Sequence, residues 1–150
     1  MSESERDCAR QILETMPLLN RWLAAQVRTQ TESISLTVPQ FRVLHYVQRR
    51  GGCSPSDVAR WRDVAAATMS RTVDTLVEKG LLERRRSAED RRRVYLHLTP
   101  AGERFVAEMH AQIERALAAE LAHATAEQRA RIAAGLAELA SFIGSPPCRP

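Results

Sequence analysis

The chain has 150 residues, of which 44% are hydrophobic and 27% charged, a composition typical of one soluble globular domain. Its formal net charge is +4. The segment from Arg84 to Arg93 holds six arginines against Glu89 and Asp90, and six minus two is also +4. We therefore expect a local basic excess and an anionic partner, either nucleic acid or a membrane surface.

The chain lacks the signals of secretion, membrane insertion and common catalytic sites. No run approaches the eighteen or so apolar residues of a membrane span, and "MSESERDCAR" has no apolar stretch, so we expect a cytoplasmic protein without membrane partners. Cys8, Cys53 and Cys148 are widely spaced and form no metal-ligand pattern, which predicts neither a disulfide framework nor a metal or other cofactor. Without G-x-S-x-G, a glycine-rich phosphate loop or H-E-x-x-H, we do not expect an enzyme.

Three helices are predicted in the first part of the chain. Residues 6–29 have apolar side chains at helical spacing: Ile12, Met16, Leu19, Leu23 and Val27. After a loop at "TESISL", Thr37 with Gln40 resembles a capping box for a helix that Gly51 and Gly52 end. Ser54 is the expected N-cap of a third, short helix to about Trp61, with Pro55 and Asp57 in its first turn.

A fourth helix and a hairpin follow a break near Arg62 and Asp63. Gly80 ends the helix, and its predicted core face is Met69, Val73, Leu76 and Val77. Beyond Gly80 the apolar period becomes two, at Val94, Leu96 and Leu98, which predicts a β-hairpin over residues 81–99 with its turn at "SAED".

Two more helices complete the chain, before a loose tail at "SPPCRP". Thr99 and Pro100 begin the first, whose apolar face is Phe105, Met109, Ile113 and Leu117. A capping box at residues 125–128 begins the last, which we expect to bury Ile132, Leu136, Leu139 and Ile143. The predicted fold class is mostly α with a small β-hairpin, a winged helix-turn-helix with N- and C-terminal dimerisation helices.

This order of elements suits duplex DNA. The outer side of the fourth helix carries small and polar residues that fit a major groove: Ala66, Ala67, Ser70, Arg71 and Asp74. Alanine methyl groups suit thymine methyl groups, and Arg71 can reach a guanine edge or a phosphate. Arginines on a projecting hairpin can follow phosphates or enter the minor groove. Strand periodicity would place Asp90 and Arg92 on one face, so that the carboxylate orients that guanidinium.

The stretch from Leu36 to Glu103 resembles the core of the multiple-antibiotic-resistance regulator (MarR) family, through "LVEKGLLERR", "DRR" at Asp90–Arg92 and "LTPAG" at Leu98–Gly102. The resemblance implies a single domain, residues 1–150, with dimerisation helices in 1–35 and 101–145 and a DNA-binding lobe in 36–100. It also implies a homodimer that represses transcription at a pseudo-palindromic operator and leaves it when a small phenolic or anionic effector binds.

Residue by residue, the resemblance gives the recognition-helix role to Ala66, Ala67, Thr68, Ser70 and Arg71. It gives the minor-groove role to Arg92 with Asp90, and we expect the other wing arginines to hold phosphates: Arg84, Arg85, Arg86, Arg91 and Arg93. The chain departs from the family pattern in two places. Asp63 replaces the usual glycine of the turn, and Ala65–Ala67 replaces polar capping residues, so we expect little base readout and more dependence on the wing.

Three further readings remain open. Helices that line the family's effector pocket carry Trp22, His45, Tyr46, Met109 and His110, although large apolar residues there are more often core. Cys8 and Cys148 offer a redox-sensing alternative. A basic helical adaptor that docks on an acidic protein or a membrane would not need the ordered helix-turn-helix and hairpin.

Overall fold

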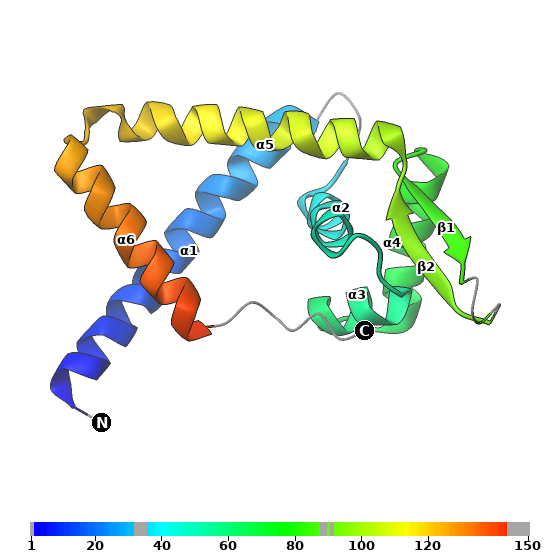
Figure 1. Cartoon of the computed structure of the whole chain (residues 1–150), viewed down its shortest axis with the longest axis horizontal. Coiled ribbons are helices and arrows are strands. Elements are labelled where there is room, and N and C mark those ends of the chain that lie inside the picture. Colours follow the sequence, from blue (N-terminus) through cyan, green and yellow to red (C-terminus); the bar gives the residue numbers. More distant parts are fainter. Residues whose placement is uncertain (1, 32–35, 88–89, 91, 144–150) are drawn as a thin grey trace. The chain divides into compact units, whose positions relative to one another are not determined.

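The computed structural model describes residues 2–31, 36–87, 90 and 92–143. Its elements, drawn in Figure 1, are α1 (Glu3–Thr31), α2 (Val38–Arg50), α3 (Pro55–Arg62), α4 (Ala66–Glu78), β1 (Leu82–Arg86), β2 (Val94–Leu98), α5 (Pro100–Glu120), the 3-10 helix η2 (Leu121–His123) and α6 (Ala126–Ile143). The fold class predicted from the sequence is confirmed. Most of the predicted loop before α2, and the predicted tail, lie outside the described residues.

The chain divides into two compact units, residues 1–113 and 114–150. Capping boxes set two helix starts in the first unit. The hydroxyl of Thr37 accepts a hydrogen bond from the Gln40 N–H, and the Gln40 side chain accepts one from the Thr37 N–H at 2.9 Å. Ser54 and Asp57 form the same reciprocal pair at 3.2 and 3.1 Å. Both predicted starts are therefore confirmed.

Helix α1 begins earlier than the sequence prediction of Arg6. The Ser2 hydroxyl accepts a hydrogen bond from the Glu5 N–H at 3.2 Å, and Glu5 accepts one from the Ser2 N–H at 2.8 Å. This is the S-x-x-E capping signal, which extends the helix to Glu3.

The turn between α3 and α4 is kept although it lacks a glycine. Asp63 has φ 52° and ψ 49°, in the left-handed region, and its N–H donates to carbonyls of the last turn of α3. Among the described residues it is the one non-glycine residue with positive φ. An aspartate tolerates this conformation better than most residues, and the prediction for this turn is confirmed.

The hairpin is shorter than the range expected from sequence and has a third backbone partner. Strands β1 and β2 are antiparallel, with Leu82 opposite Leu98, Arg84 opposite Leu96 and Arg86 opposite Val94. The Leu96 N–H also donates to the Cys53 carbonyl at 2.8 Å, and the Cys53 N–H donates back at 3.3 Å. The base of the hairpin is thereby tied to the segment between α2 and α3.

The described core belongs to the first unit and is built by α1–α5, the hairpin and the loop residues Leu36 and Cys53. It includes the predicted residues Met69, Val73, Leu76, Leu96 and Leu98, while Val77 is half-buried. From the predicted face of α1, only Val27 is fully buried.

Helix α6, in the second unit, has no buried residue within the single chain. The expectation that it buries its apolar face is therefore wrong for the single chain: Ile132, Leu136 and Ile143 are exposed, and Leu139 is half-buried. A single helix following η2 offers too little surface to cover them.

Candidate nucleic-acid interface

Helix α4 leaves one side open for a partner. Met69, Val73 and Leu76 take its buried side, and all five residues predicted to read DNA are exposed: Ala66, Ala67, Thr68, Ser70 and Arg71. The N-cap, Ala65, makes no side-chain hydrogen bond to the first turn, as expected from the alanine run. The surface at the start of this helix is consequently made of methyl groups and backbone.

The hairpin is fastened to α4 by one close ion pair. Arg84 Nη2 lies 2.6 Å from Asp74 Oδ1, with the two side chains 39% and 50% exposed. Arg84 stands opposite the buried Leu96, on the hairpin face turned toward the core. An arginine that the sequence assigned to phosphates therefore has a partner inside the protein, and its position ties the wing to α4.

The junction between the hairpin and α5 also holds the wing in place. The Thr99 hydroxyl donates to the Gly80 carbonyl at 2.5 Å and accepts from the Gly102 N–H at 3.0 Å. A Cβ at Gly102 would lie 2.1 Å from the Leu81 carbonyl oxygen, so this position requires glycine. The "LTPAG" segment is thus a close backbone contact between the wing and α5.

At the hairpin tip, Asp90 does not orient Arg92 as predicted. Its Oδ1 accepts a hydrogen bond from the Arg92 backbone N–H at 2.9 Å, and its Oδ2 lies 3.6 Å from Nε of Arg93. The prediction extended strand periodicity into a turn: the Arg93 N–H donates to the Asp90 carbonyl, and β2 begins only at Val94. Asp90 shapes the turn and pairs with the neighbouring guanidinium.

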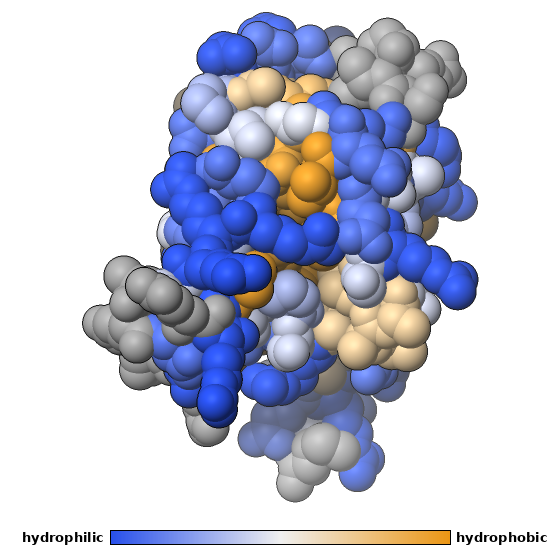
Figure 2. All heavy atoms as spheres, turned by 90° about the vertical axis from the view of Figure 1, so that its right-hand side faces the viewer, coloured by the Kyte–Doolittle hydropathy of each residue, from blue (hydrophilic) through white to orange (hydrophobic). Residues whose placement is uncertain are grey.

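The wing arginines therefore fall into two groups. Arg84 pairs with Asp74, Arg85 with Glu83 and Arg93 with Asp90. Within the part of the chain that the structure describes, Arg86 and Arg92 are exposed and have no acidic partner. Arg91 lies outside the described residues. Figure 2, which faces the side of the molecule that carries the hairpin, shows a largely hydrophilic surface around smaller hydrophobic areas.

A second basic segment was missed by the sequence reading. From Arg42 to Arg62 the chain has five arginines and one acid, Asp57, and five minus one gives +4. Acidic residues elsewhere in the chain offset this excess in the net charge. The net charge of the whole chain therefore equals that of the wing segment alone. A segment-by-segment charge count would have found it.

The residues predicted for the effector pocket do not form one site. His45 on α2 and His110 on α5 meet edge to face, with ring centroids 4.6 Å apart, and both rings lie beside Phe41. Tyr46 stacks on Trp61 instead. Met109 is fully buried core, and Trp22 is half-buried on α1.

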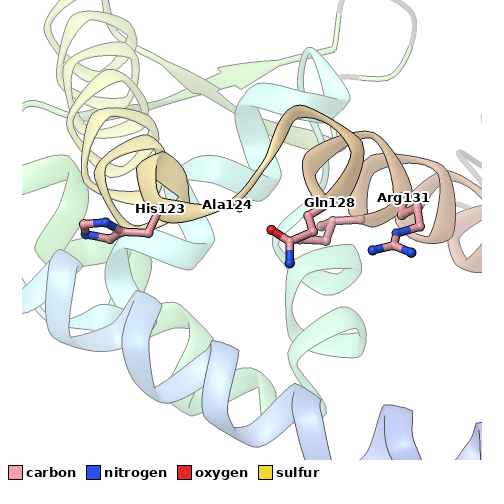
Figure 3. Close-up of a pocket in the computed structure, with 5 residues that line it drawn as sticks. His123, Ala124, Gln128 and Arg131 are labelled. Carbon is pink, nitrogen blue, oxygen red and sulfur yellow. The ribbon is translucent and has the colours of Figure 1, made fainter.

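Burial lowers the pKa of His45, and electrostatic repulsion from His110 and Arg49 lowers it further. The lowered pKa favours the neutral form of the His45 imidazole, which can accept and donate hydrogen bonds. An open hollow of about 450 Å³ lies elsewhere, within the second unit, between η2 and the first turns of α6. Figure 3 shows His123 on one side of it and Gln128 and Arg131 on the other. None of the predicted effector residues lines this hollow.

The cysteines differ in environment. Cys8 is exposed on α1, whereas Cys53 is buried, and its burial, reinforced by Asp57, raises its pKa to about 12. Cys148 lies outside the described residues.

The described side chains contain no group of three or more potential metal ligands. None of the described helices is long and apolar enough to cross a membrane.

The chain is similar to known proteins in both sequence and fold. A family model described as "MarR family" matches residues 34–93. The uncharacterized HTH-type transcriptional regulator YpoP of Bacillus subtilis is 32% identical over 97 residues, which cover 63% of this chain and 69% of that protein.

Two solved structures are similar in fold. RV1404 from Mycobacterium tuberculosis gives a TM-score of 0.81 at 23% identity, covering 99% of this chain and 100% of that one. A MarR mutant from E. coli complexed with operator DNA gives 0.62 at 23% identity, covering 86% and 93%. From the family model, the curated relative and the winged fold, the chain belongs to the MarR family of transcriptional regulators.

Proposed function

We propose that the protein is a homodimeric transcriptional repressor that binds a pseudo-palindromic operator and leaves it when a small molecule binds. The observation that carries the proposal is the pairing of an open α4 face with an arginine hairpin fixed to the same helix through Arg84 and Asp74. A structural relative in complex with operator DNA supports the same partner. The repressor reading rests on the family resemblance.

In this proposal α4 enters the major groove and the hairpin tip reaches the neighbouring minor groove. Arg71 and Ser70 are the polar base-reading candidates on the exposed face, and Ala66 and Ala67 offer only methyl groups. Arg86 and Arg92 supply cations to the backbone or the minor groove. Specificity then depends on thymine methyl groups and DNA shape more than on hydrogen bonds to bases.

Exposed apolar side chains support the homodimer. Leu13 on α1 is 73% exposed, and Phe142 on α6 is 84% exposed. A soluble chain rarely leaves such helix faces uncovered, and a second copy supplies matching faces. Two recognition helices related by a two-fold axis then read half-sites about one helical turn apart.

For the effector, the best-supported position is the cluster of His45, His110 and Phe41. Two imidazoles beside an aromatic ring can hold the hydroxyl or carboxylate and the ring of a phenolic or aromatic anion. A His45→Ala variant should keep operator affinity and lose release by the effector.

The test of the proposed function is a selection of bound duplexes from the source genome, followed by binding and light-scattering measurements. We expect one dimer per duplex and recovery of sequences with two-fold symmetry. Recovery of no preferred sequence, or a monomer on the DNA, would overturn the proposal. Compounds handled by neighbouring gene products can then be screened for release.

A further inference from the structure

The second basic segment contains an ordered stack of rings and cations. Tyr46 on α2 and Trp61 on α3 stack with centroids 4.3 Å apart and planes 21° apart. The Arg50 guanidinium lies 5.0 Å from the Tyr46 centroid, and that of Arg62 lies 5.8 Å from the Trp61 centroid. We call these four residues the aromatic–arginine cluster.

The cluster is open to solvent at one side. Trp61 is 39% exposed, and Tyr46, Arg50 and Arg62 are half-buried. The exposed part of the Trp61 side chain is therefore accessible to a partner.

Stacking prepares the two guanidinium groups for phosphate. An arginine on an aromatic ring uses the face of its guanidinium, while the N–H groups at its edge remain directed outward. Those in-plane donors match the oxygens of a phosphate. Because the rings already restrict these side chains, less conformational freedom is lost when they bind.

The cluster also lies close in sequence to the N-terminal end of α4, the end expected to enter the major groove. Trp61 and Arg62 end α3, Asp63 makes the turn, and α4 starts at Ala66. In helix-turn-helix proteins the N-terminal end of the recognition helix enters the groove, and the preceding helix crosses the backbone. The residues just before α4 are thus within reach of the phosphates at the edge of that groove.

We propose that the aromatic–arginine cluster is a second phosphate-binding surface, which holds the DNA backbone beside the half-site that α4 reads. The inference rests on the proposed DNA binding. It assigns Arg50 and Arg62 to phosphates and Trp61 to packing against the sugar–phosphate backbone. The wing and this cluster would then hold the DNA on either side of a recognition helix that offers few polar contacts.

The test measures the salt dependence of affinity for the selected duplex. In Arg50→Gln/Arg62→Gln the slope of log affinity against log salt should fall by about 1.8, because each lost phosphate contact contributes roughly 0.9. Affinity falls when salt is raised from about 50 to 200 mM. The factor by which it falls should be about 12 times smaller for this variant than for the unchanged protein. Arg115→Gln, which removes one exposed charge from the other compact unit, is the control and should change the slope little.

A second measurement does not depend on the arginine variants folding. In a Trp22→Phe background Trp61 is the one remaining tryptophan, and saturating duplex should protect its fluorescence from acrylamide. Protection together with the smaller slope supports the cluster. An unchanged slope in a variant that melts like the parent, or unchanged quenching of Trp61, overturns the inference while leaving DNA binding intact. Failure of the unchanged protein to bind any duplex would overturn the proposed function as well.

Discussion

Removing Arg86 should lower the salt dependence of DNA binding through a lost phosphate contact, whereas removing Arg84 should leave that salt dependence unchanged. The two arginines lie two residues apart in β1 and face the same way, yet their surroundings differ. Arg84 lies 2.6 Å from Asp74, while Arg86 has no acidic partner among the residues that the structure describes. Arg86 is therefore available to a phosphate, and the charge of Arg84 is already compensated.

The expected size follows from counterion release. One lost phosphate contact lowers the slope of log affinity against log salt by about 0.9. The factor by which affinity falls between 50 and 200 mM salt should therefore be about 3.5 times smaller for Arg86→Ala than for the parent. For Arg84→Ala we expect a slope close to that of the parent. Because the Arg84–Asp74 pair is about half exposed, its removal should cost at most about 1 kcal/mol of folding stability.

Fluorescence anisotropy with the selected duplex, at several salt concentrations, measures both slopes. Arg92→Ala and Arg93→Ala repeat the comparison at the tip, since Arg93 pairs with Asp90 and Arg92 contributes only its backbone N–H to that residue. Equal slope changes for Arg84 and Arg86 would refute the division of the wing into paired and available arginines. If Arg84→Ala fails to fold, as detected by circular dichroism, the ion pair contributes more to folding stability than the roughly 1 kcal/mol that we expect from its exposure.

The further predictions concern base readout, the turn and the cysteines. Replacing thymines under α4 by deoxyuridine removes only methyl groups, and affinity should fall about fourfold for each methyl that Ala66 or Ala67 contacts; no effect at any thymine would exclude methyl readout. Asp63→Gly should unfold at a denaturant concentration no lower than the parent, whereas Asp63→Val should lose about 1–2 kcal/mol, and equal stabilities would contradict the left-handed turn. At pH 8 an alkylating reagent should modify Cys8 and spare Cys53 in the native chain, and the folded state should lose stability as pH rises from about 9 toward 12, because the raised pKa of Cys53 keeps its thiol neutral only while folded; rapid native labelling of Cys53 would contradict its burial. Cys8→Ser should leave the response of DNA binding to peroxide unchanged, and a lost response would favour the redox alternative.

Local signals predicted the order of elements well. The capping boxes at Thr37 and Ser54 concern residues three apart, and the change of apolar period after Gly80 is visible in the sequence. The same rule would have found the capping residue of α1 at Ser2. Each of these features is decided by a few neighbouring residues, so a single sequence suffices to identify it.

Side-chain partners across the fold were less predictable. The pairing of Arg84 with Asp74 spans ten residues and depends on how the hairpin packs on α4, and the backbone pairing of Cys53 with Leu96 has no local signal. The stacking of Tyr46 on Trp61 likewise requires α2 and α3 to be placed first. For Asp90 the error was different, since a strand rule was applied within a turn.

The measurement that tests the central claim most directly is the salt dependence of binding by the unchanged protein to its selected duplex and to a scrambled duplex of equal length. If six to ten phosphates are held, affinity for the selected duplex should fall roughly a thousandfold or more between about 50 and 200 mM salt. The preference for that duplex over the scrambled one should persist at the higher salt. Affinity that does not change with salt, or equal affinity for the two duplexes, would contradict a sequence-specific DNA-binding function.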